Sequence, residues 1–325
     1  MKILVLGAGA VGGYFGGRLA QKGSDVTFLV RPKRAEALGR EGLRISSPLG
    51  DWTGKVQWVT QDRLAPDYDV VMLTAKAYDL SSALDAIAPA MANSGRALVW
   101  PLLNGMAHMD ALDMRFGRAR VLGGVAYIGA TLAPDGRIVH LNEFHRIVFG
   151  PRADTQARAC DALAGELAGA AFHWERIGAI EQAMWDKWVL LSTLAGMTCL
   201  MRATVGDIVA TGSGTKLTLA LLAECAGVAA AEGFPTPEPM LGNYRGMLTK
   251  TGSTFSASML RDIESGGAAE GDHILGSLLA LARKRALHTP VLEIAATHLQ
   301  AYEVRRRREQ AKVASANRAP SGAAP

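Results

Sequence analysis

The sequence predicts an α/β protein with two domains, a doubly wound parallel sheet followed by an all-α C-terminal domain. A glycine-rich turn joins a buried strand to a helix near the amino terminus, and further strands alternate with helices as far as Gly105. From about Gly178 onward the hydrophobic period is helical. A chain of 325 residues also exceeds what one core usually holds. We expect domains at residues 1–178 and 179–308 and a disordered tail at 309–325.

The composition is that of a soluble globular protein, with 49% hydrophobic and 20% charged residues. The longest apolar stretch, Trp188 to Met201, is shorter than the roughly 20 residues of a membrane span. Glycines interrupt the apolar amino terminus, which argues against a signal peptide. Cys160, Cys199 and Cys225 are an odd number and are widely spaced, and the histidines show no metal-ligand spacing. We expect a cytoplasmic protein without a membrane span or a bound metal.

The formal net charge of +5 does not by itself indicate nucleic-acid binding. From Glu303 onward there are six basic and two acidic residues, so the rest of the chain is nearly neutral. An arginine run at a helix C-terminus is favoured by the helix dipole, and the Ala/Ser/Pro/Gly-rich residues after it are typical of disorder. A basic patch for nucleic acid is the less favoured alternative.

The amino terminus has the pattern of a strand, a turn, a helix and a second strand. Lys2 to Leu6 predicts the first strand, Val11 to Lys22 an amphipathic helix, and Asp25 to Val30 the second strand. The sequence GAGAVG lies at the first turn, at the spacing of a dinucleotide-binding fingerprint. This setting predicts a Rossmann-type unit.

Each residue of the turn has an expected role. Gly7 makes the tight turn, Gly9 lets the backbone approach a pyrophosphate, and Gly12 lets the helix pack closely on the strand. The phosphates would lie on the helix N-terminus, at the amides of Ala10 and Val11. An ordinary tight turn is the alternative.

The end of the second strand favours NADP over NAD. In NAD-binding proteins this strand ends in a carboxylate that binds the ribose 2′-hydroxyl, whereas here Arg31 follows it, with Lys33 and Arg34 close behind. Guanidinium groups match the geometry of a 2′-phosphate. A solvated loop is the alternative.

Two further strands, Asp69 to Lys76 and Arg96 to Gly105, flank a helix expected at Asp79 to Met91. Ligands of doubly wound sheets bind beyond the carboxyl ends of the strands, where Lys76 and Asn104 lie. Lys76 is a candidate for cofactor phosphate or ribose, and Asn104 for the nicotinamide side or a substrate oxygen. A surface lysine and an Asn-Gly turn are the alternatives.

After Gly105 we expect short strands at Tyr127–Thr131, Arg137–Leu141 and Arg146–Phe149. The second domain is expected to be all α. Its helices should break at Gly206, Gly212–Gly214, Pro235–Pro239, Gly266–Gly267 and Pro290.

The stretch MWDKWVLLSTLAG places one lysine, Lys187, before an apolar run. Burying an unpaired ammonium costs several kcal/mol. The side chain therefore either extends to the surface or has a function.

Six short motifs follow one another along the chain. They are GAGAVGG with Arg31 at the strand end, LTAK at Lys76, NG at Asn104, MWDKW at Lys187, SASMLRD with Ser258, and GGAAEGDHILG with Glu270. In this combination, up to about Arg308, the chain resembles the ketopantoate reductases (2-dehydropantoate 2-reductases). The resemblance implies NADPH-dependent reduction of 2-dehydropantoate to pantoate, a step toward pantothenate and coenzyme A, with the substrate in a cleft between the domains.

The resemblance also implies roles for single residues. Lys187 would be the general acid that protonates the alkoxide left by hydride transfer, and Glu270 would orient it and contact the cofactor. Ser258 would hydrogen-bond the substrate carboxylate, and Asn104 would contact substrate and cofactor. The alternatives are a helix-start carboxylate for Glu270 and a helix cap for Ser258.

Three positions depart from the family pattern. The family commonly has asparagines four and eight residues after the lysine and three before the serine, whereas this chain has Leu191, Ala195 and Phe255. Either Ser192, Thr193 or water substitutes for the amides, or the substrate is another 2-oxo acid with a more apolar tail. A reductase of another 2-oxo or β-keto acid and a non-catalytic NADPH-binding sensor are therefore alternatives. The expected partner is a small 2-oxo acid, and a homodimer is an open alternative.

Overall fold

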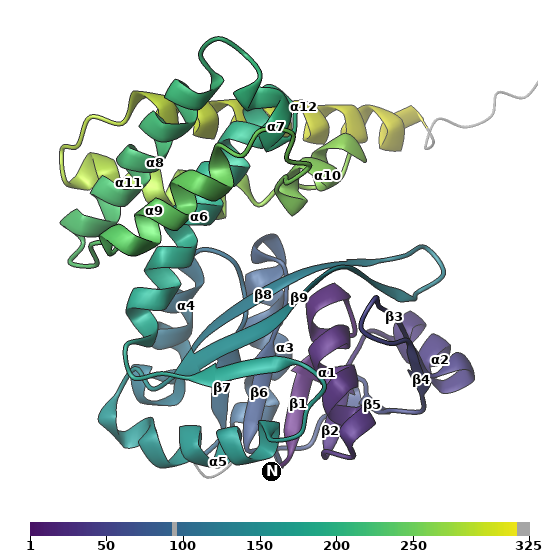
Figure 1. Ribbon diagram of the computed structural model, residues 1–325. Helices are drawn as coiled ribbons and strands as arrows, with labels where there is room; N and C mark the ends of the chain where they lie inside the picture. Colours follow the sequence, from purple (N-terminus) through teal and green to yellow (C-terminus); the bar gives the residue numbers. More distant parts are fainter. Residues whose placement is uncertain (93–95, 317–325) are drawn as a thin grey trace, which may run out of the picture. The chain divides into compact units, whose positions relative to one another are not determined.

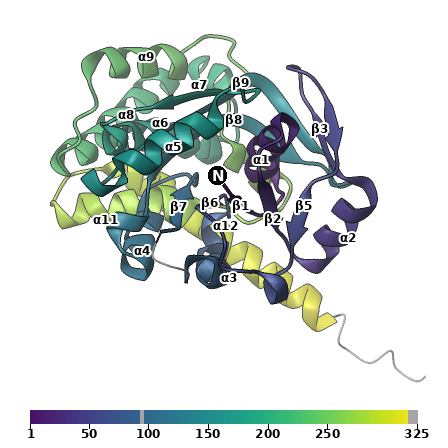
Figure 2. The ribbon, with the colours of Figure 1, turned by 90° about the horizontal axis from the view of Figure 1, so that it is seen from below.

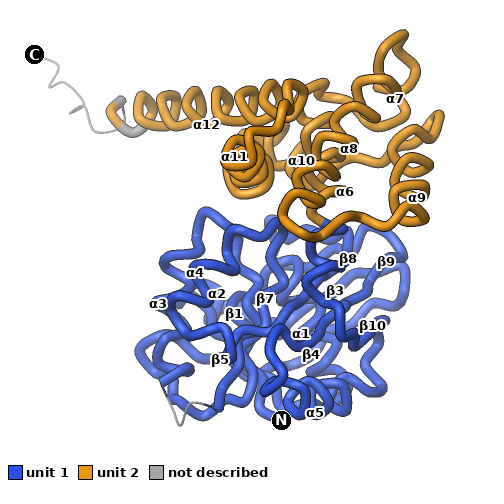
Figure 3. Tube along the Cα trace, turned by 90° about the vertical axis from the view of Figure 1, so that its left-hand side faces the viewer, with its two compact units in different colours: residues 1–187 blue, residues 188–325 orange. Residues whose placement is uncertain are grey.

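The computed structural model describes residues 1–92 and 96–316. The chain divides into two compact units, Met1–Lys187 and Trp188–Pro325 (Figure 3). Unit 1 contains two β-sheets with helices, and the described residues of unit 2 form helices and loops. The predicted fold class, a Rossmann-type sheet followed by an all-α part, is confirmed.

The strands of unit 1 are β1 (Ile3–Leu6), β2 (Val26–Leu29), β3 (Leu43–Ser46), β4 (Trp52–Gly54), β5 (Gln57–Val59), β6 (Val70–Leu73), β7 (Leu98–Pro101), β8 (Gly123–Leu132), β9 (Ile138–Gly150) and β10 (His173–Arg176). Its helices are α1 (Ala10–Lys22), α2 (Pro32–Glu41), α3 (Leu80–Met91), α4 (Ala107–Phe116) and α5 (Ala157–Leu167), with short 3₁₀ turns η1 (Gln61–Arg63), η2 (Ala77–Asp79), η3 (Arg118–Arg120) and η4 (Asp154–Gln156). The last helix to begin in unit 1 is α6 (Ile180–Met201).

The first sheet is parallel and has the strand order β5-β2-β1-β6-β7 (Figures 1 and 2). Successive side chains of a strand point to opposite faces, so β1 contributes to two cores. Ile3 and Val5 pack in the cluster that contains Tyr14 of α1. Leu4 packs in the cluster that contains Ile87 of α3. Helices therefore cover both faces, as expected for a doubly wound sheet.

The second sheet has the order β10-β9-β3-β4, and β8 pairs with β9 in an antiparallel ribbon (Figure 1). The prediction of separate strands at Arg137–Leu141 and Arg146–Phe149 was wrong, because β9 runs through both. The residues between them, Asn142 to Phe144, are polar or exposed, and their sequence resembles a loop. The predicted strand Tyr127–Thr131 lies within the longer β8, toward its C-terminal end.

The helices of unit 2 after α6 are α7 (Val205–Val209), α8 (Gly214–Ala231), α9 (Glu238–Leu248), α10 (Ser258–Glu264), α11 (Ser277–Lys284) and α12 (Pro290–Ala316), with a π-helical turn η5 (Asp272–Gly276). The predicted break at Gly206 was wrong, because this glycine lies inside α7. The chain instead turns at Arg202, which has a positive φ of 54°. The breaks before α8, at Gly266–Gly267 and at Pro290 agree with the prediction.

Among the described helices, α8 is long and apolar enough to cross a membrane by length and composition alone. Core helices pass the same test. Leu221, Cys225 and Val228 of α8 are buried, and the helix contacts α11 and α12 of its own unit. Glu224 of α8 accepts hydrogen bonds from the first amides of α12, such as Leu292 N at 2.8 Å. These contacts are those of a core helix in unit 2.

Helix α12 continues to Ala316, beyond the end that we predicted at Arg308. Residues 309–316, which we assigned to a disordered tail, are therefore helical, and residues 317–325 lie outside the described part of the chain. Helix propensity and ion pairs such as Arg305–Glu309 favour this continuation.

Candidate functional site

The glycine-rich turn lies between β1 and α1, at the carboxyl edge of the parallel sheet. Gly7 has a φ of +87°, a conformation that favours glycine, and its amide donates to Leu29 O at 2.9 Å. At Gly12 an added Cβ would lie 2.7 Å from Gly7 O and would also meet the hydroxyl of Thr74. Gly7 and Gly12 therefore have the turn and close-packing roles that we expected.

The local structure of Gly9 does not itself require glycine. Its φ of −88° is open to any residue, and an added Cβ would meet nothing within 4 Å. Gly9 is the N-cap of α1 and has no side-chain capping bond, and the first turn carries no acidic residue. The amides of Ala10 and Val11 begin this helix, and the first amides of a helix lack intrahelical partners. Open space in front of such amides fits a pyrophosphate.

Two of the basic residues after β2 have different environments. The Arg31 side chain is 83% exposed and lies 3.9 Å from Asp79 Oδ2. Arg34 is half-buried, and its guanidinium donates to Ala8 O of the glycine-rich turn at 3.0 Å. Burial and nearby Arg44 lower the pKa of Arg34. Arg31 is thus open to a ligand, whereas Arg34 holds the turn, a role that spacing alone did not indicate.

Lys76 and Asn104 lie beyond the carboxyl ends of β6 and β7, at the same edge as Gly7 and Arg31. Lys76 is the N-cap of η2, and its carbonyl accepts from the amide of Asp79 at 2.9 Å. Unit 1 therefore brings together the predicted cofactor residues Gly7, Gly9, Ala10, Val11, Gly12, Arg31, Lys76 and Asn104 at one edge of its parallel sheet.

Helix α6 packs closely on the start of β8 because glycines face it. Gly123 and Gly150 are paired in the β8–β9 ribbon, and an added Cβ on either residue would crowd Ile180 of α6. Ile180 and Met184 are buried in the core that covers the parallel sheet. Lys187 follows two turns later on the same helix.

A buried ion cluster fixes the first turn of α6. The Arg152 side chain is 4% exposed and donates to both carboxylate oxygens of Asp113 at 2.7 and 2.8 Å. It also donates to Glu181 of α6 at 3.2 Å, and Arg118 donates to the same carboxylate at 2.9 Å. Although burial opposes its charge, bonds to Asp113 and Glu181 raise the pKa of Arg152. Through Arg152, the segment that follows β9 is bonded to Asp113 of α4 and to Glu181 of α6.

Lys187 is buried, and its ammonium is bonded within unit 1. Nζ donates to Ala126 O of β8 at 2.6 Å and to Asn104 Oδ1 at 3.0 Å. It also lies 5.5 Å from the centroid of the Tyr127 ring. The side chain does not extend to the surface, so it has the form expected of a functional lysine. Ala126 and Tyr127 were not predicted, since only the strand register places them here.

Glu270 and Ser258 belong to unit 2. Glu270 is buried and lies just before the π-helical turn η5, a type of turn common at functional sites. The amide of the preceding residue, Ala269, donates to Glu303 Oε1 of α12 at 2.7 Å. Ser258 is exposed at the first position of α10, whose N-cap is Ala257, so the helix-cap alternative for Ser258 was wrong.

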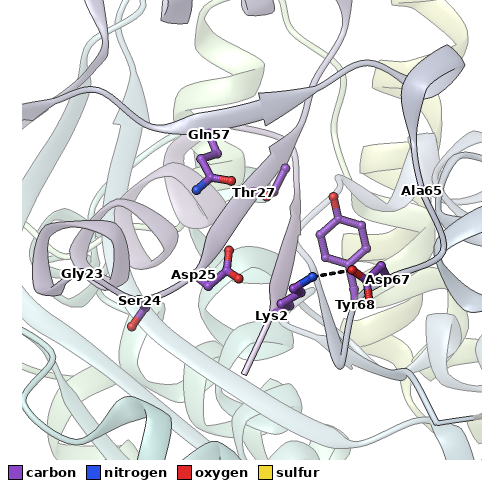
Figure 4. A pocket seen from close by; sticks show the side chains of 9 residues that line it. All are labelled: Lys2, Gly23, Ser24, Asp25, Thr27, Gln57, Ala65, Asp67 and Tyr68. Carbon is purple, nitrogen blue, oxygen red and sulfur yellow. Dashed lines mark hydrogen bonds and ion pairs between the residues drawn. The ribbon is translucent and has the colours of Figure 1, made fainter.

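A polar hollow of about 470 Å³ lies at the opposite edge of the parallel sheet (Figure 4). Lys2 and Asp25, which precede β1 and β2, line it together with Asp67 and Tyr68. Lys2 and Asp67 form an ion pair across it. The hollow is therefore distinct from the predicted cofactor edge. Among the described residues, no group of three or more His, Cys, Asp or Glu side chains could hold a metal ion.

Two family models match the chain. The model "Ketopantoate reductase PanE/ApbA" matches residues 3–154, and "Ketopantoate reductase PanE/ApbA C terminal" matches residues 179–303. An uncharacterized oxidoreductase of Bacillus subtilis, YkpB, is 36% identical over 93% of this chain and 99% of its own length. The 2-dehydropantoate 2-reductase of Archaeoglobus fulgidus is 29% identical over 86% of this chain and 90% of its own length.

Solved structures share the fold over nearly the whole chain. A PanE/ApbA family ketopantoate reductase from Ralstonia eutropha has a TM-score of 0.83 and 26% identity, covering 94% of this chain and 100% of its own. A D-mandelate dehydrogenase with NADH and anilino(oxo)acetate has a TM-score of 0.83 with the same coverage. At 22% identity this second likeness shows the fold alone.

Proposed function

Because the chain belongs to the ketopantoate reductase family, whose members are oxidoreductases acting on CH–OH groups, we propose that it reduces 2-dehydropantoate to pantoate with NADPH. The observation that carries the proposal is the buried ammonium of Lys187, bonded to Asn104 and Ala126. Asn104 lies at the same edge of the sheet as the glycine-rich turn. We propose that the reaction takes place in the cytoplasm, as a step of pantothenate biosynthesis.

The proposed mechanism gives each site residue a stated task. A cofactor held at the glycine-rich turn would supply the hydride that reduces the 2-oxo carbon. Lys187 Nζ donates a proton to the carbonyl oxygen as negative charge develops there, which yields the hydroxyl group. Asn104 Oδ1 and Ala126 O orient the ammonium through its other hydrogens. Glu270 of unit 2 orients Lys187 and contacts the cofactor, and Ser258 binds the substrate carboxylate.

The cofactor proposed for this site is NADPH. The glycine-rich turn fits a pyrophosphate, and the exposed Arg31 guanidinium is free to bind a 2′-phosphate once it leaves Asp79. NADPH should then bind more than about tenfold tighter than NADH, and Arg31→Ala should remove most of this preference. Calorimetry with both cofactors measures it. Equal affinities in the unaltered protein would contradict the choice of NADPH.

A second substrate class is favoured by the face of α6 that follows Lys187. Leu191 and Ala195 lie one and two turns further along this face, where the family commonly has asparagines. A site without amide groups there cannot strongly favour a substrate hydroxyl. The D-mandelate dehydrogenase shows that the same fold also serves an apolar 2-hydroxy acid. The alternative substrate is thus an unhydroxylated 2-oxo acid with an apolar tail.

A panel of 2-oxo acids, followed by NADPH absorbance, tests the function. We expect turnover of 2-dehydropantoate, with kcat/KM for an unhydroxylated branched 2-oxo acid within about a hundredfold. Lys187→Ala should lower kcat by about 10²- to 10⁴-fold while NADPH still binds. A protein that binds NADPH but reduces none of the acids would be a sensor, and undiminished turnover by Lys187→Ala would remove the lysine from the mechanism.

A further inference from the structure

Tyr127 lies beside the ammonium of Lys187 within unit 1. It follows Ala126, whose carbonyl accepts from Nζ at 2.6 Å, so β8 contributes two successive residues to the surroundings of the amine. The centroid of the Tyr127 ring is 5.5 Å from Nζ, within the range of a cation–π contact. Asn104 Oδ1 also accepts from Nζ, at 3.0 Å.

Strand register holds the tyrosine in place. Tyr127 pairs with Arg146 of β9, whose guanidinium lies 6.0 Å from the ring centroid and is itself ion-paired with Glu175. Tyr127 also packs against the core that contains Ile180 and Met184 of α6. The same helix carries Lys187, so one core fixes both the ring and the amine.

The phenol remains neutral in the pH range of interest. Burial raises the pKa of the Tyr127 hydroxyl, Arg146 opposes this shift, and the charge of Asp186 adds to it. A neutral ring presents a negative π face to a cation without adding a second titrating charge. The carbonyl, the amide oxygen and the ring each favour the charged form of this amine, whereas its burial favours the neutral form.

We propose that Tyr127 is a positioning residue for Lys187, whose ring face holds the ammonium in place and in its protonated form. This inference rests on the proposed function, since it concerns the same proton donor. The inference adds Tyr127 of β8 to the site residues that the sequence motifs predicted. The ring, rather than the hydroxyl, carries the effect.

The test compares Tyr127→Phe, which keeps the ring, with Tyr127→Leu, which removes it. In protein labelled with ¹³C-lysine, the Cε resonance of Lys187 is titrated by NMR and is identified by its loss in Lys187→Ala. Tyr127→Leu should lower the titration midpoint of Lys187 by about half a pH unit or more, and Tyr127→Phe should keep it within about 0.2 units. The charged groups that act on the Tyr127 ring, Asp186 and Arg146, are the same in all variants, and so is Glu270, which the proposed function assigns to Lys187.

Turnover gives a second readout. With the best 2-oxo acid of the panel, Tyr127→Leu should lower kcat about tenfold or more with little change in KM. In the pH profile of kcat, the basic limb of this variant should move to lower pH. Tyr127→Phe should match the unaltered protein. An unchanged midpoint in Tyr127→Leu, or equal effects of the two substitutions, would overturn the proposal. If the leucine variant does not fold, Tyr127→Met replaces it.

The NMR titration requires no substrate. If no 2-oxo acid is reduced, the proposed reductase function fails, while the Lys187 midpoint still tests the contact with Tyr127. If turnover is present and the midpoint does not move, the function stands and the inference about Tyr127 fails.

Discussion

Gly9 and Gly12 belong to one turn but need glycine for different reasons. Gly12 is required by the fold, because a Cβ would lie 2.7 Å from Gly7 O and would meet Thr74. Gly9 has open space, so the fold does not require glycine there, and the proposed cofactor would supply the requirement. Gly12→Ala should lower the free energy of unfolding by about 1–3 kcal/mol net, because crowding against Gly7 O and Thr74 outweighs the roughly 1 kcal/mol that alanine gains in a helix.

Gly9→Ala is the matched variant. It should leave the unfolding free energy within about 0.5 kcal/mol, while the Kd for NADPH rises at least about tenfold as the added methyl occupies the space for the pyrophosphate. Denaturant unfolding and calorimetry measure the two effects. Unchanged NADPH affinity in Gly9→Ala would show that the pyrophosphate does not lie against this turn.

The motifs allowed these glycines and Lys187 to be predicted from the sequence, because their spacing along the chain is itself the signal. The role of Arg34 and the neighbours of Lys187 could not be predicted in this way. Arg34 and Ala8 are 26 residues apart and come into contact only in the folded chain. The pairing of β8 with β9 places Tyr127 beside the amine of Lys187. Contacts between residues distant in sequence have no local pattern.

At the level of elements, the position of α6 depends on the Arg152 cluster. Arg152→Met would leave the carboxylates of Asp113 and Glu181 without this cation, and both are mostly buried. We expect a loss of about 3 kcal/mol in unfolding free energy and a lower kcat, because Lys187 lies two turns further along the same helix.

Arg115→Met is the matched control for this cluster. Arg115 also pairs with a carboxylate, that of Asp85 at 3.3 Å, but both side chains are at least half exposed. Loss of this ion pair should lower the free energy of unfolding by less than about 1 kcal/mol and leave kcat unchanged. Chemical denaturation of both variants checks the comparison, and equal losses would contradict a special role of the buried cluster.

A histidine cluster joins α1 to β9. His145 Nδ1 lies 2.8 Å from the hydroxyl of Tyr14, and the ring stacks on His140. Burial, with the charges of His140, His173 and Arg18, lowers the pKa of His145 to about 4. No carboxylate contributes to this shift, so no negative charge offsets the lowering of the His145 pKa.

The sign of the resulting pH dependence follows from proton binding. Between about pH 6.5 and 4 the unfolded chain binds a proton at His145 that the folded chain does not, so stability is full above pH 6.5 and falls as the pH is lowered. We expect a loss of unfolding free energy of up to about 3 kcal/mol over this interval, since each pKa unit corresponds to about 1.4 kcal/mol. His145→Gln retains an acceptor for the Tyr14 hydroxyl and should reduce this slope in urea unfolding curves. An identical slope would contradict the assignment.

The elements were predicted where their periodicity was strong. The helices Val11–Lys22 and Asp79–Met91 correspond to α1 and α3. The buried residues of α3 recur at helical spacing, whereas α1 is buried without interruption from Gly12 to Leu19. The strands β3, β4 and β5 were missed because each has only three or four residues and includes exposed or half-buried positions. Short strands of this kind are defined by their partners.

At the level of the whole molecule, the change from alternating elements to a helical period predicted the two-part organisation. The compact units divide after Lys187, whereas the C-terminal family model begins at residue 179, next to the boundary that we predicted. Helix α6 crosses the division after Lys187, since Ile180 is buried in the core of unit 1 and Trp188 donates to Ile274 O at 2.9 Å in unit 2. A continuous helix gives no local sign of such a division.

The final prediction concerns the C-terminal end of α12. Residues Glu309 to Val313 are exposed, and the Arg305–Glu309 ion pair is more than half exposed at 3.7 Å. Glu303 is buried, binds Arg306 at 2.9 Å and accepts from the amide of Ala269, next to Glu270. The stabilising contacts of α12 should therefore end before residue 309.

Deleting residues 309–325 should leave the Tm within about 2 °C and kcat unchanged, because exposed termini bury little surface. Deleting residues 303–325 also removes Glu303 and should lower both the Tm and kcat. The amide of Ala269, next to Glu270, would lose the buried Glu303 carboxylate that accepts its hydrogen bond. Thermal unfolding and NADPH-dependent turnover of the two truncations decide the question. A large loss in the shorter deletion would mean that residues 309–325 dock on the body of the protein or on a partner.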